Sequence, residues 1–144
     1  MPPSIEVIAI SDQQALERAF QLRRAVFCVE QGVDPGAEFD GRDRDAVQFA
    51  AFRDGRLVGT CRVLGEGASV AVQRVAVERA QRRSGVGAAL IRAAEAHARA
   101  HGAREIVLHA QRSSEEFYAR LGYRAEGDPF LEEAIEHVTM RHGL

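Results

Sequence analysis

The strongest constraint on the fold is a predicted strand that passes through a glycine-containing loop into a helix near the middle of the chain. Residues 69–77 carry apolar side chains on both alternating faces, which is typical of a central strand covered on both sides. The loop Arg82-Arg83-Ser84-Gly85-Val86-Gly87 follows, and a helix then continues to His101. Unpaired backbone N–H groups and the positive end of the helix dipole converge at such a junction. The junction therefore predicts a pyrophosphate site, to which Arg82 and Arg83 would add charge.

The segments on either side predict a mixed α+β fold and argue against a dinucleotide-binding fold. Asp54-Gly55 lies between two β-type runs, 46–53 and 57–64, and is a strong hairpin signal. The glycine loop thus follows a hairpin and lacks the third glycine of the dinucleotide fingerprint. The other expected elements are a strand at 5–10, a helix from Ser11 to Gly32, an irregular connection at 33–44, a strand at 106–110, a helix at 113–121 and strands at 123–126 and 136–141.

The amino-acid composition excludes several classes of function. All 19 basic residues are arginines, so neither a lysine Schiff base nor a P-loop lysine is available. The net charge of −2 and the scattered arginines argue against a nucleic-acid partner. The longest apolar run, residues 25–29, is far shorter than a membrane helix, and no secretory signal is visible. Cys28 and Cys61 have neither a metal-knuckle nor a disulfide-scaffold spacing. We therefore expect a cytoplasmic protein with free, unreactive thiols and no membrane contact.

Charged residues occupy two places where contact with the interior or with a ligand is expected. Arg23 and Glu30 fall on the apolar face of the predicted helix, so they either pair with each other or line a pocket. Glu38, Asp40 and Asp43 lie in the irregular connection. For these acids solvent exposure is the simpler expectation, and attraction of a cationic amine is the alternative.

Four histidines are candidates for proton transfer or metal binding. His97 and His101 have the i, i+4 spacing of a helical zinc pair, but no third ligand accompanies them, so no metal is expected. His109 lies on the strand at 106–110 and His137 on the last strand. Either could act as a base toward an amine or line its pocket.

Two motifs resemble those of the GNAT N-acetyltransferases. The loop at 82–87 matches the family pattern Gln/Arg-x-x-Gly-x-Gly/Ala, and residues 74–77 before it also look like the family's. Residues 111–123, Gln-Arg-Ser-Ser-Glu-Glu-Phe-Tyr-Ala-Arg-Leu-Gly-Tyr, are similar to the family stretch Asn-x-x-Ala-x-x-Phe-Tyr-x-x-x-Gly-Phe. The resemblance implies one GNAT acetyltransferase domain over residues 1–144. Its central sheet would be mostly antiparallel, with one splayed parallel strand pair and helices on both faces.

The resemblance implies that acetyl-coenzyme A is the cosubstrate and lies between the strands at 69–77 and 106–110. The loop at 82–87 would hold its pyrophosphate. Backbone groups of Val75, Ala76 and Val77 would pair with the pantetheine arm and polarise the thioester carbonyl.

The second motif supplies two further residues by the same resemblance. Tyr118 matches the family tyrosine that protonates the departing thiolate, and Gln111 stands in the place of the usual Asn. The chain departs from the family pattern at Arg79 and Arg83, which replace the usual Pro and Gly.

The implied reaction is transfer of acetyl to a primary amine of a small molecule or peptide by direct attack in a ternary complex, without a metal. Glu30 and His109 are the candidates for the base. Arg23, Glu38 and Asp40 are the candidates for acceptor binding. Small domains of this fold commonly dimerise, so a homodimer is left open.

Two other functions remain as alternatives at this level. Residues 22–27, residues 38–43 and Arg62 also resemble acyl-homoserine-lactone synthases, distant relatives that share the fold. The absence of Trp and the presence of Phe117-Tyr118 favour the acetyltransferase. The third reading is a sensor that binds acetyl-coenzyme A without turning it over.

Overall fold

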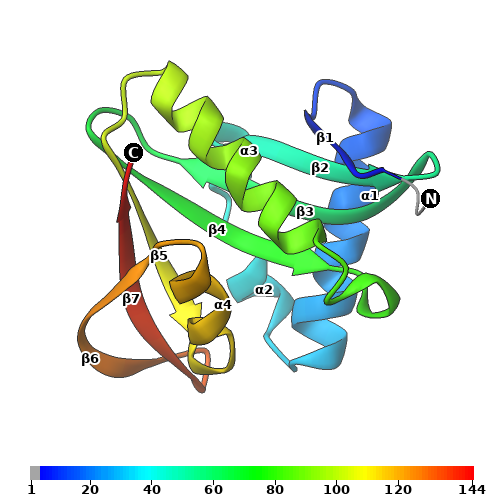
Figure 1. Cartoon of the computed structure of the whole chain (residues 1–144). Helices are drawn as coiled ribbons and strands as arrows, with labels where there is room; N and C mark the ends of the chain where they lie inside the picture. The colour runs from blue at the N-terminus through cyan, green and yellow to red at the C-terminus, as the bar shows by residue number, and fades with distance from the viewer. Residues whose placement is uncertain (1–3) are drawn as a thin grey trace.

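A seven-stranded mixed sheet forms the centre of the protein, as the computed structural model shows for residues 4–144 (Figure 1). The strand order is β1-β2-β3-β4-β5-β7-β6, and β4 and β5 form its one parallel pair among the described residues. The elements are β1 (Glu6–Ala9), α1 (Gln13–Arg23), η1 (Arg24–Glu30), α2 (Pro35–Glu38), η2 (Asp43–Asp45), β2 (Val47–Arg53), β3 (Arg56–Leu64), β4 (Ser69–Val77), η3 (Arg79–Gln81), α3 (Val86–Ala100), β5 (Glu105–Gln111), η4 (Arg112–Ser114), α4 (Glu115–Arg120), β6 (Arg124–Glu132) and β7 (Ile135–Gly143). The predicted α+β class with a mixed sheet is confirmed.

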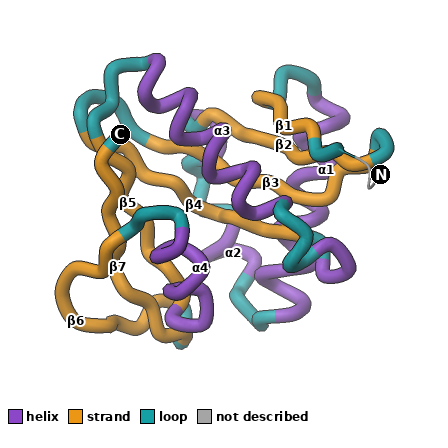
Figure 2. Tube along the Cα trace, viewed as in Figure 1, coloured by secondary structure: helices purple, strands orange, loops and turns teal. Residues whose placement is uncertain are grey.

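Strands β4 and β5 separate along their length, and this separation positions the site. Residues 69–71 of β4 pair with residues 105–107 of β5, and no pairing continues beyond them. In Figures 1 and 2 the β5–β7–β6 arm swings away from β4, with α4 beside it. A wedge therefore opens between the C-terminal halves of two parallel strands.

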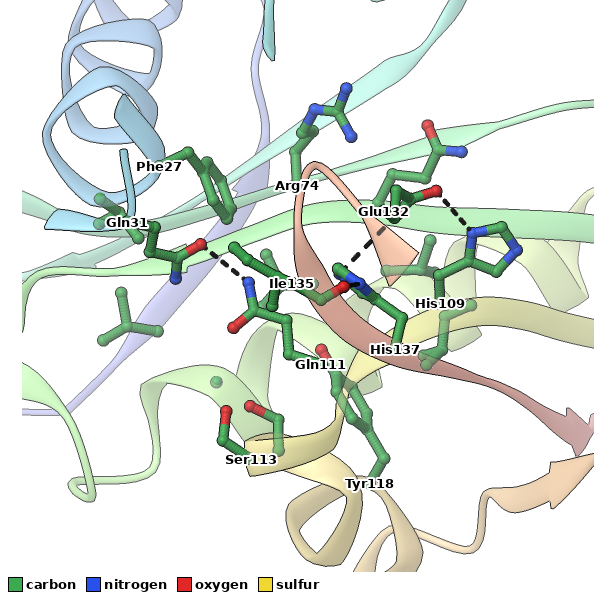
Figure 3. A pocket seen from close by; sticks show the side chains of 18 of the residues that line it. Phe27, Gln31, Arg74, His109, Gln111, Ser113, Tyr118, Glu132, Ile135 and His137 are labelled. Atoms are coloured by element: carbon green, nitrogen blue, oxygen red, sulfur yellow. Dashed lines mark hydrogen bonds and ion pairs between the residues drawn. The ribbon is translucent and has the colours of Figure 1, made fainter. Parts of the chain in front are cut away.

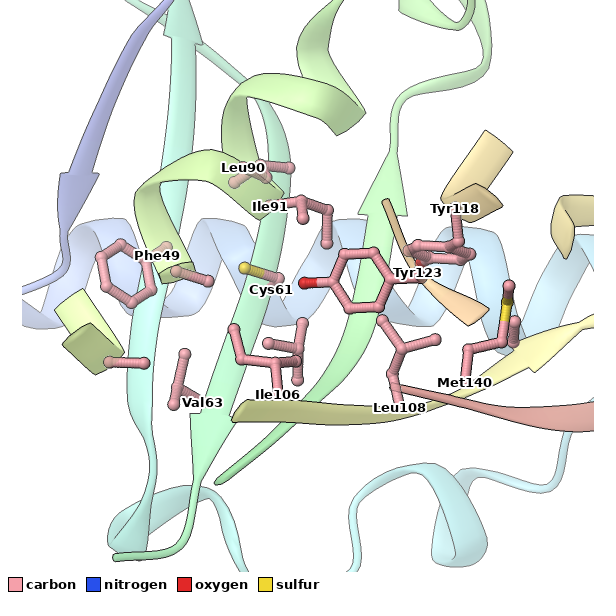
Figure 4. Close-up of a cluster of buried hydrophobic side chains, with 14 of the residues drawn as sticks. Phe49, Cys61, Val63, Leu90, Ile91, Ile106, Leu108, Tyr118, Tyr123 and Met140 are labelled. Carbon is pink, nitrogen blue, oxygen red and sulfur yellow. The ribbon is translucent and has the colours of Figure 1, made fainter. Parts of the chain in front are cut away.

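Helices cover both faces of the sheet. Figure 2 shows α3 lying across one face of β2–β4, while α1 lies behind the same strands. The α3 face buries Leu90, Ile91 and Ala94 against side chains such as Val63 and Ile106, which Figure 4 shows gathered in the core. Across residues 4–144, no helix is both long enough and apolar enough to cross a membrane.

One helix that we expected to be continuous changes its winding. The predicted α-helix up to Gly32 is α-helical only to Arg23 and then π-helical from Arg24 to Glu30. A π-helix bonds i to i+5, so the seven-residue spacing no longer keeps two side chains on one face. This explains why Arg23 is fully buried whereas Glu30, seven residues on, is exposed. The prediction that both lie on the buried face is wrong for Glu30.

The last hairpin was incompletely predicted. Strand β6 extends to Glu132, well past the predicted end at residue 126, and its register with β7 shifts between Glu126 and Phe130. Pro129 lies within that irregular stretch, where no ladder N–H is required. Glu133 and Ala134 both have positive φ, as two-residue hairpin turns require, but neither is a usual turn residue. The sequence therefore carried no turn signal.

Glu95 of α3 is a buried charge, because it is only 4% exposed. The Tyr123 hydroxyl donates to its carboxylate at 2.9 Å, and Arg92 pairs with it at 2.7 Å. Two partners from different elements make burial of this charge tolerable.

Candidate active site

The wedge between β4 and β5 opens into a cavity of about 890 Å³. Its size is within the range of small-molecule sites. Eleven predicted site residues line it: Glu38, Asp40, Val75, Val77, Arg82, Arg83, Gly85, Gly87, His109, Gln111 and Tyr118. The other five predicted residues, Arg23, Glu30, Ala76, Ser84 and Val86, are not among its lining residues.

The free edge of β4 supplies backbone hydrogen-bonding groups to the cavity. The Glu78 N–H donates to the Val58 carbonyl at 2.8 Å, and Ala76 pairs with Thr60 of β3. Because N–H groups alternate along a strand, those of Val75 and Val77 point away from β3, toward the wedge. A β-bulge at Arg74, with φ of 58°, re-aims this stretch. The edge can therefore pair with an extended ligand arm.

The glycine loop ends the wedge at the start of α3. Gly85 caps the helix with φ of 92°, and the helical bonding begins when the Ala89 N–H donates to the Gly85 carbonyl at 3.0 Å. The first amides of α3 consequently have no partner within the helix. Arg53 of β2 fixes the loop by donating to Gln81 Oε1 at 2.9 Å and to the Ser84 carbonyl at 3.2 Å. Ser84 is thus a support of the loop, a role that the sequence motif did not reveal.

The two arginines of the loop differ in their contacts. Arg82 donates to both carboxylate oxygens of Glu30, at 2.9 and 3.1 Å, and its Nε donates to the Val77 carbonyl at 3.0 Å. Arg83 has φ of 63° and lines the cavity. The Glu30 carboxylate therefore partly neutralises Arg82, and Glu30 ties η1 to the loop.

The family resemblance implies that this loop holds the pyrophosphate of coenzyme A. On that expectation, replacing Gly85 with Ala should weaken coenzyme A binding, because a side chain at φ of 92° strains the backbone that aims the amides. Calorimetric titration with coenzyme A measures the effect, for which we expect roughly tenfold, or about 1.4 kcal/mol. Gly67→Ala is the matched control, since Gly67 has φ of 85° in a turn outside the cavity. An equal loss of affinity in both variants would contradict the assigned role of Gly85.

Tyr118 projects from α4 into the cavity. The residue is 8% exposed, and Figure 3 shows its hydroxyl directed toward Gln111 and His137. No hydrogen bond joins this hydroxyl to any other group in residues 4–144. Burial raises the pKa of Tyr118 above its ordinary value, so the phenol stays protonated. A protonated phenol at this position can donate to a bound thiolate.

Gln111 is the last residue of β5 and lines the cavity. Its Nε2 donates to Gln31 Oε1 at 2.8 Å, joining the end of β5 to the residue that follows η1. Phe27 of the π-helical segment and Gln31 directly after it both line the cavity. The predicted amide at residue 111 is therefore present but already engaged by a partner from another element.

Three carboxylates and three arginines form one ion-pair network beside the cavity. Arg23 pairs with Glu38 at 2.8 Å and with Asp43 at 2.6 Å, and both Arg23 and Glu38 are almost fully buried. The full set of ion pairs is Arg23–Glu38, Arg23–Asp43, Arg62–Asp40, Arg62–Asp43, Arg74–Glu38 and Arg74–Asp40. The network is neutral overall and holds the 33–45 segment against β3 and β4.

This network corrects two expectations. Solvent exposure is wrong for Glu38, which is 3% exposed, and for Asp43, whose side chain is 16% exposed, whereas Asp40 is exposed as expected but pairs with Arg62 and Arg74. Arg23 pairs with these acids and not with Glu30. No local sequence pattern signals this pairing, because the partners within the network are 15 to 36 residues apart.

The acidic limb of the stability curve is expected to depend on this network. The hydrogen bond from Arg62 holds the pKa of Asp40 well below its usual range. Burial opposes ionisation of Asp43, but hydrogen bonds from Arg23 and Arg62 outweigh it and lower its pKa. Stability from a lowered pKa is present above the unfolded value of about 3.9 and is lost as pH falls through the folded value.

Asp40→Asn should therefore make the fall of Tm between roughly pH 4 and pH 2 shallower than in the unmodified protein. Circular-dichroism melting across that range checks this. Asp54→Asn in the β2–β3 turn serves as control. An unchanged slope in Asp40→Asn would count against the network as the source of acid sensitivity.

The remaining histidines and both cysteines have no metal-type arrangement. The rings of His97 and His101 contact each other in a tilted arrangement, with centroids 4.1 Å apart and an interplanar angle of 31°. Among residues 4–144, no three His, Cys, Asp or Glu side chains are grouped to hold a metal ion. Burial raises the pKa of Cys61 to about 12, and burial also raises the pKa of Cys28. Neither thiol is therefore activated as a nucleophile.

The chain is similar to known proteins over most of its length. Residues 8–144 match the model of the acetyltransferase (GNAT) domain. Over 139 residues the chain is 33% identical to protein BSU40680 of Bacillus subtilis (strain 168), which covers 94% of this chain and 95% of that protein.

The chain is also similar in fold to solved structures. An acyl-CoA N-acyltransferase from Pseudomonas aeruginosa superposes with a TM-score of 0.81 at 32% identity, covering 97% of this chain and 99% of that one. A GNAT family acetyltransferase from Elizabethkingia anophelis, solved with acetyl-CoA bound, gives a TM-score of 0.76 at 16% identity, covering 97% and 98%. The second likeness concerns the fold alone.

Proposed function

Because the chain belongs to the GNAT acetyltransferase family, we propose that it transfers acetyl from acetyl-coenzyme A to a primary amine of a small molecule or peptide. The observation that carries this proposal is the cavity between diverging β4 and β5. The cavity is lined both by Arg83, Gly85 and Gly87 at the start of α3 and by Tyr118 of α4. This combination of groups suits a ligand that carries both a diphosphate and a thioester.

Binding in this proposal relies on backbone groups. The α3 amides hold the diphosphate, and the free edge of β4 pairs with the pantetheine arm as an added strand would. The N–H of Val75 or Val77 then polarises the thioester carbonyl and stabilises the oxyanion that forms on attack. Side-chain replacements at Arg79 and Arg83 leave these amides in place, so the departures from the family pattern are compatible with cofactor binding.

Tyr118 is the proposed general acid. It is buried, protonated and without a competing hydrogen bond in the described chain, so its proton is available to the coenzyme A sulfur as the C–S bond breaks. The acceptor amine approaches from the η1 and β6–β7 side, where Phe27, Gln31 and His137 line the cavity. Attack within a ternary complex requires no covalent enzyme intermediate, in keeping with the absence of an activated thiol.

The ion pairing argues against the lactone-synthase alternative. Arg23, Arg62, Asp40 and Asp43, which carry that resemblance, bond to one another within the network. Their role is thereby accounted for by the packing of the 33–45 segment. Lactone formation from S-adenosylmethionine and an acylated carrier protein, measured by mass spectrometry, would reverse this choice.

Two measurements on the unmodified protein test the proposal. Calorimetry should detect coenzyme A binding, and a thiol-reactive dye should report amine-dependent release of coenzyme A from acetyl-coenzyme A across a panel of primary amines. Binding with no release for any amine would favour a sensor. Absence of binding would overturn the assignment.

A further inference from the structure

We infer that His137 is the general base for the acceptor amine, with Glu132 as its positioning partner. The inference rests on the proposed acetyl transfer and names the one proton-accepting group that this function still lacks. His137 is 7% exposed and lines the cavity. It belongs to β7, the strand inserted between β5 and β6.

The sheet register places His137 beside the reaction volume. His137 lies directly opposite Gln111 of β5 on one side and Phe130 of β6 on the other. Opposite residues of antiparallel strands project from the same face, so the three side chains form one row across the sheet. In Figure 3 the His137 ring lies close to Gln111, on the side toward which the Tyr118 hydroxyl points. This row therefore brings the His137 imidazole to the same cavity into which the Tyr118 hydroxyl projects.

Hydrogen bonding fixes which ring nitrogen can accept a proton. His137 Nδ1 lies 2.7 Å from the Ile135 carbonyl oxygen. A carbonyl only accepts, so Nδ1 carries the hydrogen and Nε2 keeps its lone pair in the neutral ring. Phe130 stacks on the ring at a centroid distance of 6.0 Å and an interplanar angle of 22°, which restricts its rotation. The imidazole is thus held as a proton acceptor.

Glu132 is placed to stabilise the imidazolium that proton transfer creates. Its Oε2 lies 3.8 Å from His137 Nε2, and its Oε1 lies 3.2 Å from His109 Nδ1. Once the ring has taken a proton, the carboxylate attracts its positive charge. Glu132 acts through His137 and is therefore a positioning residue for the imidazole ring.

The other candidates for the base are less well placed. The side chain of His109 is 48% exposed, against 9% for His137. Glu30 pairs with Arg82 and is not among the residues that line the cavity. Neither combines burial, a fixed lone pair and a place in the cavity as His137 does.

The proposed step balances in protons and electrons. His137 Nε2 takes one proton from the acceptor ammonium, and the freed electron pair forms the N–C bond to the thioester carbonyl carbon. The tetrahedral adduct then breaks its C–S bond, and the departing thiolate takes the Tyr118 proton. The nitrogen and the imidazolium each release one proton to solvent, Tyr118 takes one back, and one proton is released per turnover.

The first test is independent of the acceptor. Nitrogen-15 NMR of the histidine-labelled full chain, assigned with His137→Gln, reports the tautomer of the neutral His137 ring. We expect hydrogen on Nδ1 and a lone pair on Nε2. Hydrogen on Nε2 would overturn the inference, whatever the activity of the protein.

The second test uses two probe acceptors at pH 7, propylamine and O-methylhydroxylamine. Propylamine is protonated at this pH, as a lysine side chain is, and needs a base, whereas the alkoxyamine is already neutral. His137→Gln should lower kcat/KM with propylamine by ~10²-fold or more and with the alkoxyamine by less than about fivefold. Glu132→Gln should show the same selective loss at smaller size.

Two matched variants separate the role from structural damage. His101→Gln changes an exposed imidazole that does not line the cavity, and Glu126→Gln changes a carboxylate of β6 that is 62% exposed and pairs with Arg141. Both should retain the ratio of the two kcat/KM values. An equal loss with both probes in His137→Gln, no loss at all, or the same selective loss in His101→Gln would each overturn the inference. A failure of the unmodified protein to bind coenzyme A would instead refute the proposed function.

Discussion

Tyr118→Phe is expected to slow coenzyme A release from acetyl-coenzyme A by ~10²-fold or more while leaving the affinity for coenzyme A unchanged. The variant removes only the hydroxyl, which has no partner within residues 4–144 and therefore leaves no buried group stranded. The phenyl ring keeps its place beside Phe117 and Tyr123. Thiol-release assays give the rate, and calorimetry on the same preparations gives the affinity for coenzyme A.

The second tyrosine of the chain provides the control. The Tyr123 hydroxyl donates to buried Glu95, so Tyr123→Phe should lower the free energy of unfolding by about 1–3 kcal/mol. Below its melting temperature, that variant should keep the rate of thiol release. A full rate in Tyr118→Phe, or a parallel loss of rate and affinity, would remove Tyr118 from the role of acid.

Glu38→Gln is expected to produce the largest loss of stability. Arg23 is fully buried, and its Nε donates to Glu38 Oε1 at 2.8 Å. Removing one partner of a buried pair costs about 3–5 kcal/mol, and the remaining Asp43 contact places this variant near the lower value. For a chain of this size that corresponds to a fall in Tm of roughly 6–12 °C.

Urea unfolding measures the change in free energy directly. Glu116→Gln is the control, since Glu116 and its partner Arg120 are 79% and 76% exposed and their pair should contribute about 1 kcal/mol at most. Similar losses in the two variants would show that the buried network contributes no more than a surface pair.

Local signals predicted the elements that carry the cofactor side of the site. The Asp54-Gly55 turn, the doubly apolar strand at 69–77 and the glycine loop all appeared where expected. Each of these depends on backbone conformation or on alternation within a few residues, which a sequence displays directly. The family motifs then placed Tyr118 and Gln111, both of which line the cavity.

The amino-acid order alone thus determined the strand, loop and helix that form the proposed diphosphate end, because their geometry follows from neighbouring residues. Only the tertiary structure decided which charges meet. It paired Arg23 and Arg62 with acids from a segment that looked solvated, turned Glu30 toward Arg82 through a π-helical turn, and placed His137 opposite Gln111. These contacts join residues from different elements, and burial of a charge depends on partners that no local pattern specifies.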